Sequence, residues 1–358
     1  MQQVDKPGRA RVALDPEEKA RLGKWLDHRG FAAPGEALEI YELSGGASNE
    51  VWELVRGQHR WVVRKPPRKV PPGRNETMLR EYRLLRALRD TDVPHPRVLA
   101  VCEDTTVLGS VFYVMEHVDG WSCMDLASWP SPFDFDLEAR AGLAYQLVEG
   151  IALLAQVDWR AAGLEGFGRP ENFHERQVDR WLTHLEPVRF RELPGLDEAA
   201  AFLRRYRPRS YQPGIMHGDY QFANVMFAHG APARLVAIVD WEMATVGDPL
   251  LDLAWVLMSW PNPDEDRKSA GYVDYTGMPS REDLMEYYGK RTGRDLDELD
   301  YYLVLARFKM AAVLEAGYAR FRAGQAENPK MAYFGDIALD MARKAGELAR
   351  STQLNARG

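Results

Sequence analysis

Cysteine and long apolar runs are both scarce in this chain of 358 residues. The two cysteines, Cys102 and Cys123, form no Cys-x-x-Cys pair, so the sequence predicts neither a disulfide framework nor a cysteine zinc site. The apolar stretch 250–260 is interrupted by Asp252 and is far shorter than the roughly 20 residues that cross a bilayer. Residues 1–14 carry basic side chains, but no apolar segment follows them, which is unlike a secretory signal. We therefore expect a cytoplasmic protein without a membrane segment.

A basic excess is also missing, since the formal net charge is −7. Binding to nucleic acid phosphates needs a concentrated basic surface, so we expect no nucleic acid partner. The local run of arginine and lysine within 64–89 is interpreted mainly as a solvated helix face. Hydrophobic residues make up 46% and charged residues 28%, which is ordinary globular composition, and the length favours two lobes over one core. The sequence leaves the oligomeric state open.

The first third of the chain predicts a small antiparallel sheet with two helices. Asp15-Pro16-Glu17-Glu18 combines an N-cap side chain, a proline at the first helical position and two acids, so a helix is expected from there to about His28. Helical periodicity predicts a second helix over 76–89. Short, partly β-branched runs punctuated by glycine predict five strands, over 37–43, 50–56, 61–65, 97–102 and 110–118.

The remaining two thirds predict mainly helices. The expected helices cover 137–157, 174–190, 196–206, 281–292, 296–317 and 330–352. A pair of strands, 224–227 and 234–239, is expected around the turn His229-Gly230-Ala231-Pro232. The change of pattern near Asp119-Gly120 predicts a sheet-containing lobe over 1–119 and a helical lobe over 120–358, which together make an α+β fold.

The strongest chemical signal is His217-Gly218-Asp219, with Asn224 five residues after the aspartate and Asp240 at the end of an apolar strand. At average residue frequencies the loop pattern arises in about one chain in a thousand of this length. Phosphoryl transfer needs a carboxylate at the acceptor hydroxyl and oxygen ligands that hold Mg²⁺ on the ATP phosphates. Asp219 fits the first role, and Asn224 and Asp240 fit the second. His217 is interpreted as a residue that fixes the loop by hydrogen bonds, with direct proton transfer as the alternative.

These residues resemble the catalytic loop and metal aspartate of the protein-kinase-like superfamily, in the form found in the aminoglycoside phosphotransferase and choline kinase family. The segments 238–242, with Asp-Trp-Glu in place of Asp-Phe-Gly, and 247–254, with Gly-Asp-Pro, strengthen the resemblance. It implies a bilobal protein-kinase-like fold that binds ATP and Mg²⁺ and phosphorylates an alcohol. Four shorter segments resemble the branch of kinase domains fused to acyl-CoA dehydrogenases, which is associated with hydroxy-acyl substrates: 64–67, 80–82, 93–96 and 112–116.

The segment after Asp240 distinguishes between kinase subclasses. Only seven residues separate Asp240 from Asp248, and no Ala-Pro-Glu follows, so there is no room for the activation segment on which a peptide acceptor docks. The acceptor is therefore expected to be a small molecule with a hydroxyl group. Asp248 is interpreted as a plain N-cap of the next helix. Asp252 lies inside an apolar helix and needs a buried partner, for which the catalytic loop backbone is a candidate.

A buried carboxylate is also predicted in the first lobe. Glu81 shares a stripe of its helix with apolar residues, so it needs a cation. In kinases the equivalent glutamate pairs with a strand lysine that touches the ATP phosphates. The resemblance assigns that position to Arg64, and strand alternation allows only one of Arg64 and Lys65 to face the same side. Lys65 stands directly before Pro66, where the strand is expected to end, so Arg64 is preferred.

Two backbone segments complete the predicted nucleotide site. The loop Ser44-Gly45-Gly46-Ala47-Ser48-Asn49 lies where a phosphate-covering loop is expected, although it has no Gly-x-Gly-x-x-Gly pattern. Its hydroxyls and backbone amides are assigned to phosphate contact, with an ordinary hairpin turn as the alternative. The resemblance places the adenine-binding hinge at the end of the last strand, where Glu116 and Val118 are named for their backbone groups.

Two functions stay open on this sequence. The first is an active small-molecule kinase, and the second is a nucleotide-binding regulator of the pseudokinase type, suggested by Arg64 and the imperfect glycine loop. An acyl-CoA dehydrogenase is not supported, because no segment resembling a flavin-binding domain is left. The helical segments 124–214 and 255–358 are expected to bind the acceptor, but they do not distinguish an aminoglycoside, a hydroxy-acyl compound or another alcohol, nor does the sequence distinguish ATP from GTP. The tryptophans are expected to be mostly core, with one or two lining the acceptor site: Trp121, Trp129, Trp159, Trp181, Trp255 and Trp260.

Overall fold

The computed structural model describes residues 10–31, 35–43, 49–123, 128–262, 273–325 and 329–357. Within these ranges the chain forms two compact units. The first unit contains the chain up to residue 127 together with 225–229 and 235–242, and the second contains 128–224, 230–234 and 243–358. Three short segments of the predicted helical lobe, which start at residues 120, 225 and 235, therefore belong to the first unit. The assignment of separate roles to 1–119 and 120–358 stays a prediction.

The first unit is built on a five-stranded antiparallel sheet with the strand order β1-β2-β3-β5-β4. Its elements are α1 (Pro16–His28), β1 (Leu38–Glu42), β2 (Glu50–Arg56), β3 (His59–Lys65), α2 (Arg74–Ala87), β4 (Val98–Cys102) and β5 (Phe112–Glu116). All seven predicted elements are confirmed, with ends that differ by no more than two residues. The side chain of Asp15 accepts a hydrogen bond from the backbone N–H of Glu17, as the predicted helix start requires.

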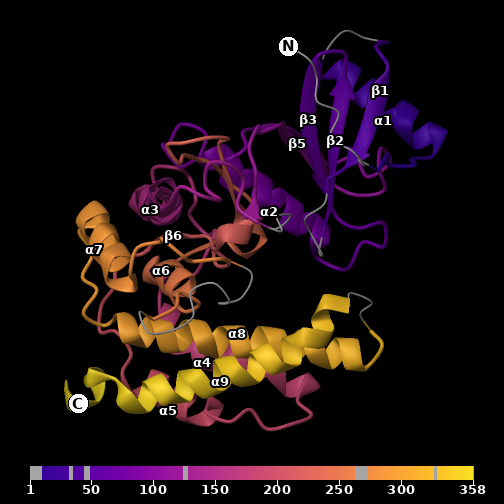
Figure 1. Cartoon of the computed structure of the whole chain (residues 1–358). Coiled ribbons are helices and arrows are strands. Elements are labelled where there is room, and N and C mark those ends of the chain that lie inside the picture. Colours follow the sequence, from indigo (N-terminus) through magenta and orange to yellow (C-terminus); the bar gives the residue numbers. More distant parts are fainter. Residues whose placement is uncertain are drawn as a thin grey trace. The chain divides into compact units, whose positions relative to one another are not determined.

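The two faces of this sheet carry different chemistry. One face is apolar and packs on α1 through Leu22 and Leu26, and Figure 1 shows α1 beside the sheet. Because side chains alternate along a strand, Arg64 and Tyr113 lie on the other face, together with α2. The buried side of α2 includes a carboxylate, Glu81, among apolar residues. The charged predicted site of the first unit is therefore separated from its apolar core by the thickness of the sheet.

A hairpin of late residues completes the first unit. It joins β7 (Val225–Phe227) to β8 (Leu235–Ile238), and Trp121 forms an isolated bridge with Phe227. The indole N–H of Trp121 donates to the carbonyl of Ala228, so this tryptophan belongs to the core of the hairpin. At the other end of the hairpin, the N–H of Ile238 donates to the carbonyl of Pro94. These contacts fix the strand end that leads into Asp240.

The second unit is mainly helical and is organised around one long helix. Its helices are α3 (Leu137–Gln156), α4 (Phe173–Leu185), α5 (Leu196–Arg205), α6 (Leu250–Leu257), α7 (Arg281–Thr292), α8 (Leu299–Arg322) and α9 (Phe334–Ser351). Helix α8 packs on α4, α5, α6 and α9, and Figure 1 shows α8 and α9 side by side. Strands β6 (Gly214–Met216) and β9 (Thr245–Gly247) pair antiparallel and flank the His-Gly-Asp loop. Short 3-10 helices cover Glu186–Val188, Phe222–Asn224, Trp241–Met243, Pro329–Tyr333 and Gln353–Arg357.

Four predicted helix ends are wrong by three residues or more, and one of them is the start of α8, at Leu299 rather than at 296. Helix α4 ends at Leu185 rather than at 190, because Pro187 cannot continue an α-helix and the chain turns into a 3-10 helix there. Helix α8 extends to Arg322, five residues beyond its predicted end. The last helix starts at Phe334, because Pro329 opens a 3-10 turn before it. Among the described helices, none is long and apolar enough to cross a membrane.

Candidate active site

The first unit holds a buried ion pair on the α2 face of the sheet. Nε of Arg64 donates to Oε2 of Glu81 at 2.9 Å, and the hydroxyl of Tyr113 donates to the same oxygen at 2.9 Å. The side chains of Arg64 and Glu81 are 8% and 1% exposed. Burial raises the pKa of Glu81, and Arg64 beside it opposes that shift. The predicted pairing of Arg64 with Glu81 is therefore found in the structure.

The same arginine reaches the predicted metal aspartate. Nη2 of Arg64 donates to Oδ1 of Asp240 at 2.6 Å. Asp240 is partly exposed, with 31% of its side chain open to solvent, and its backbone has φ = 63°. That left-handed conformation is uncommon for a residue with a side chain and costs of order 1–3 kcal/mol, so the surrounding contacts must hold it. Arg64 thus links α2, through Glu81, to the strained residue that follows β8.

Lys65 faces the other way, as strand alternation predicts. Its ammonium lies 3.1 Å from Oε2 of Glu50 and 5.1 Å from the ring centre of Trp52. It also donates to the carbonyl of Pro66. Only Arg64, of these two cations, contacts Glu81 and Asp240 in the described structure.

Glu242, two residues after Asp240, makes contacts that the sequence analysis missed. Its Oε2 accepts from Nη1 of Arg74 at 3.0 Å and from Nδ2 of Asn49 at 3.1 Å. These bonds join the start of α2 and Asn49, the last residue of the predicted glycine loop, to the segment of Asp240. The acid in Asp-Trp-Glu was visible in the sequence, but its partners lie 168 and 193 residues away.

In the second unit, the His-Gly-Asp loop is held by the buried carboxylate of Asp252. Its Oδ2 accepts from the N–H of His217 at 2.6 Å, and its Oδ1 accepts from the N–H of Gly218 at 2.8 Å. Asp252 is 2% exposed, and burial raises its pKa, while His217 and the two amides oppose the shift. The predicted partner of this carboxylate is confirmed.

Two further features fix the shape of the loop. The ring of His217 is buried, and its Nδ1 accepts from the N–H of Asp219 at 3.3 Å, which is the loop-fixing contact expected of it. Gly218 has φ = 85°, and a Cβ at this position would lie 2.6 Å from the carbonyl oxygen of Met243. Glycine is therefore required here both by the backbone conformation and by space.

Asp219, the predicted base, is partly buried and oriented by three side chains. Its Oδ1 accepts from Nε1 of Trp255 at 3.1 Å and from Nε2 of Gln221 at 3.0 Å. Its Oδ2 accepts from Nδ2 of Asn224 at 3.0 Å, and the same amide nitrogen donates to the carbonyl of Asp219 at 2.8 Å. Trp255 and Gln221 were not assigned to the site from the sequence, although Trp255 was among the tryptophans expected to line it or to fill the core.

A buried lysine of α8 also meets this loop. The ammonium of Lys309 donates to the carbonyl of Gly218 and lies 4.2 Å from the ring centre of Trp255. Burial lowers the pKa of Lys309 to about 8, while Asp219 and Asp252 raise it. The sequence signal was available, because Lys309 interrupts an apolar helix face and so needs a partner.

The interpretation of Asp248 as a plain N-cap is wrong. Its Oδ1 does accept from the N–H of Leu250, but the residue is fully buried and its Oδ2 accepts from the hydroxyl of Tyr302 at 2.7 Å. Nε2 of His174 lies 2.9 Å from the same oxygen. Asp248 therefore connects α4, α6 and α8 rather than capping one helix.

The remaining predicted nucleotide residues are only partly described. Ser44, Gly45, Gly46 and Ser48 lie outside the described residues. The N–H of Glu116 already donates to the carbonyl of Arg97 at 2.9 Å, so the backbone group that Glu116 can offer to a base is its carbonyl. Val118 follows β5 and is partly buried.

The residues predicted to bind Mg²⁺ fit a hard cation by their chemistry. Carboxylate and amide oxygens are its preferred protein ligands, and Asp240 is a partly exposed carboxylate. Asn224 turns its amide nitrogen toward Asp219, which leaves the amide oxygen for other ligands. Within the described ranges, no three or more His, Cys, Asp or Glu side chains are arranged as a metal site. A magnesium ion held by one carboxylate and by nucleotide phosphates needs no group of that kind.

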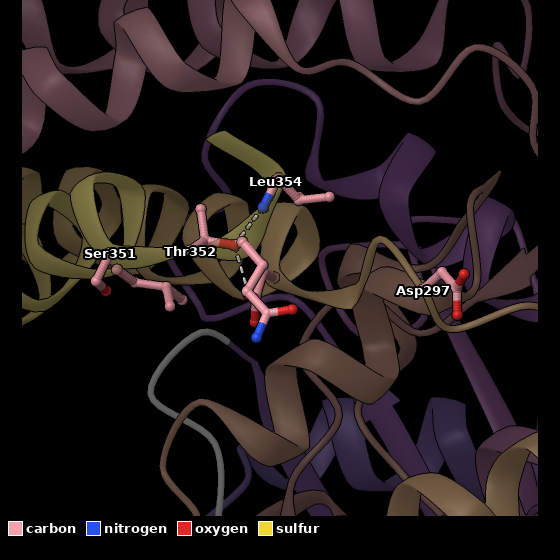
Figure 2. A pocket seen from close by; sticks show the side chains of 7 residues that line it. Asp297, Ser351, Thr352 and Leu354 are labelled. Carbon is pink, nitrogen blue, oxygen red and sulfur yellow. Dashed lines mark hydrogen bonds between the residues drawn. The ribbon is translucent and has the colours of Figure 1, made fainter. Parts of the chain in front are cut away.

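A hollow of about 240 Å³ lies elsewhere in the second unit, near the start of α8 and the end of α9 (Figure 2). Asp297, Ser351, Thr352 and Leu354 are among the residues that line it, and the hydroxyl of Thr352 donates to Asp300. None of the predicted site residues contributes to it.

Comparisons with known proteins show which family the chain resembles. A family model described as "Phosphotransferase enzyme family" matches residues 39–288. Acyl-CoA dehydrogenase family member 11 of Gallus gallus is 31% identical over 325 residues, which cover 88% of this chain and 41% of that protein. The chain therefore spans about two fifths of the length of the curated relatives it matches.

Among solved structures, phosphotransferases have a fold similar to that of this chain. A protein of Ralstonia eutropha, classed by inference as an aminoglycoside phosphotransferase, has a TM-score of 0.79 and 30% identity, with 92% of this chain and 98% of that one covered. An aminoglycoside phosphotransferase solved with AMP-PNP and hygromycin B has a TM-score of 0.60 and 15% identity, with 92% and 99% covered. The second likeness concerns the fold alone.

Proposed function

We propose that this chain, which belongs to the phosphotransferase enzyme family, transfers the γ-phosphoryl group of ATP to a hydroxyl of a small molecule. The proposal rests on the hydrogen bonds that hold the side chain and the loop of Asp219. Its carboxylate is partly exposed, both oxygens are oriented by donors, and its loop is tied to a buried aspartate through two backbone amides. Orientation of this kind before the substrate arrives is what a preorganised general base uses.

In the proposed reaction Asp219 accepts the proton of the acceptor hydroxyl. The hydroxyl oxygen forms a bond to the γ-phosphorus, the bond between that phosphorus and the bridging oxygen breaks, and the electron pair leaves with ADP. His217 is proposed to fix the loop, because its Nδ1 accepts from the backbone N–H of Asp219. The protein's main contribution is therefore to orient the acceptor hydroxyl and stabilise charge.

Several of the predicted residues would hold the nucleotide. Arg64, supported by Glu81, is proposed to contact the phosphates, and the loop with Ser44, Gly45, Gly46 and Ser48 to cover them. Glu116 and Val118 would offer backbone groups to the base. Asn224 and Asp240 would hold Mg²⁺, which when bound would neutralise phosphate charge. The structural neighbour that was solved with AMP-PNP supports ATP as the donor.

A nucleotide-binding regulator without turnover is the second candidate, and one observation favours it. Arg64 lies 2.6 Å from Oδ1 of Asp240, so a fixed cation already neutralises part of the carboxylate that would bind Mg²⁺. In that case Mg-ATP would raise the melting temperature without any ADP being formed. The ordered carboxylate of Asp219 has no evident use in such a protein.

ADP release tests the proposal. The wild type is incubated with Mg-ATP and a panel of alcohols that includes aminoglycosides, free hydroxy acids and hydroxy-acyl CoA esters, the last because the curated relatives are acyl-CoA dehydrogenase family members. At least one acceptor is expected to raise ADP release, and Asp219→Asn is expected to lower it by about 10²-fold or more. Asp197→Asn, an exposed change in α5, is the control and should leave the rate unchanged. ADP release that persists in Asp219→Asn contradicts the proposal.

A further inference from the structure

Lys309 is a charged residue in a place where a neutral side chain would pack as well. It is 4% exposed on α8, and the neighbouring helix positions are apolar. Taking an ammonium out of water costs several kcal/mol, so burial alone does not account for a lysine here. A methionine would fill a similar volume without that cost. The charge therefore needs a reason outside packing.

The contacts of Lys309 converge on the predicted catalytic loop. Its ammonium donates to the carbonyl of Gly218, the residue directly before Asp219. It also lies over the rings of two tryptophans, at 4.2 Å from the centre of Trp255 and 5.6 Å from that of Trp181. A cation over an indole face attracts the negative face of the ring.

Trp255 carries the connection from Lys309 to the carboxylate. Its indole N–H donates to Oδ1 of Asp219 at 3.1 Å, while its ring face lies against the ammonium. A cation on the face of an indole withdraws electron density from the ring, which makes the N–H a better donor. Lys309 therefore acts on Asp219 through two neighbours, the backbone carbonyl of Gly218 and the ring of Trp255.

We propose that Lys309 and Trp255 are positioning residues for Asp219, which hold its carboxylate in the orientation in which it accepts a proton. The proposal rests on the proposed phosphotransferase function for its catalytic meaning. The contacts themselves do not depend on that function. Neither residue needs to touch the substrate.

The proposed role of Lys309 predicts how turnover and stability change with pH. The charged groups that face the ammonium are Asp219 on the loop, Asp252 on α6 and Arg180 on α4. Burial lowers the pKa of Lys309 to about 8, below the value of about 10.4 in an unfolded chain. Between these two values the unfolded chain binds more protons, so this group makes the protein more stable as the pH rises. The positioning charge is lost over the same range, so turnover should fall while stability rises.

Two variants separate positioning from packing. Lys309→Met is expected to keep or raise the melting temperature, because a buried charge is removed, and yet to lower kcat by about 10- to 100-fold with little change in KM for ATP. Trp255→Phe keeps an aromatic ring but has no indole N–H, and should lower kcat in the same way. The controls are Lys290→Met, an exposed lysine of α7, and Trp121→Phe, which loses an indole hydrogen bond within the hairpin core.

A readout that needs no turnover keeps the test independent of the enzyme assay. The full chain is labelled with 5-fluorotryptophan, and the resonance of Trp255 is identified by its absence in Trp255→Phe. In the wild type this resonance should shift through a midpoint near pH 8, and in Lys309→Met the shift should be absent. The resonance should also move in Asp219→Asn, which changes the group that accepts from the indole.

The outcomes distinguish the two proposals. If no acceptor gives ADP, the proposed function fails, and the fluorine resonance alone decides the role of Lys309. A Trp255 resonance that is the same in the wild type and in Lys309→Met over pH 6 to 10 overturns the inference. So does a Lys309→Met protein with an unchanged kcat, or one that loses stability in proportion to its loss of turnover.

Discussion

Replacing Asp252 by asparagine tests how the loop of Asp219 is held. Each carboxylate oxygen accepts from one backbone amide, of His217 at 2.6 Å and of Gly218 at 2.8 Å. Asparagine keeps one acceptor and presents an NH₂ group to the other amide. A hydrogen bond to a charged group contributes about 1.5–3 kcal/mol, and a buried amide without an acceptor costs about 1–3 kcal/mol.

Removing the buried charge offsets part of that loss. We therefore expect Asp252→Asn to lower the free energy of unfolding by about 2–4 kcal/mol. For a unit of this size, that corresponds to a fall in melting temperature of about 4–16 °C. Turnover should fall as well, because Asp219 is attached to the same loop.

Thermal unfolding followed by circular dichroism measures this effect. Asp197→Asn is the matched control, since its side chain is exposed in the first turn of α5 and the change should cost less than about 1 kcal/mol. A melting temperature of Asp252→Asn within about 1 °C of the wild type refutes the reasoning, because the two amides would then have other adequate acceptors.

Two further substitutions address the first unit and the loop. Arg64→Lys keeps the charge but cannot reach both Glu81 and Asp240 with one ammonium, so we expect a lower melting temperature and ATP binding weakened by about tenfold in calorimetry. Equal ATP affinity of the wild type and Arg64→Lys would show that the guanidinium group of Arg64 is not needed for ATP binding. Gly218→Ala places a methyl group 2.6 Å from the carbonyl oxygen of Met243 at a positive φ, so a loss of about 2 kcal/mol or more is expected in chemical denaturation. An alanine variant as stable as the wild type would contradict this reading of the loop.

The sheet and most helices could be predicted because their signals are local. The strand over 50–56 and the helix over 16–28 were predicted with their observed bounds, since alternation, capping residues and glycine punctuate these segments. The errors at the ends of α4 and α9 occur at prolines, where the chain passes into a 3-10 helix. The order β1-β2-β3-β5-β4 depends on pairing over long sequence distances and was not predicted.

The same limit governs the site. Asp252 and Glu81 could be identified as buried acids that need partners, and their partners were found where nearby motifs suggested them. Lys309 carries the same kind of signal, but its acceptor lies 91 residues away and no motif names it. Asp248 was misinterpreted for the same reason, because the Asp-Pro pair suggests a cap, while its buried partners are 74 and 54 residues distant. Sequence thus shows that a buried charge needs a partner more readily than it shows which partner.

Transfer of the γ-phosphoryl group tests the central claim most directly. ATP labelled at the γ-phosphorus is mixed with excess protein, Mg²⁺ and an acceptor that raised ADP release, and the products are followed by quenched single-turnover analysis. With the wild type, we predict that the label appears in a phosphomonoester of the acceptor. Asp219→Asn should bind ATP with unchanged affinity but transfer the label at least about 10²-fold more slowly. Transfer at the wild-type rate by Asp219→Asn would contradict the assignment of Asp219 as the base.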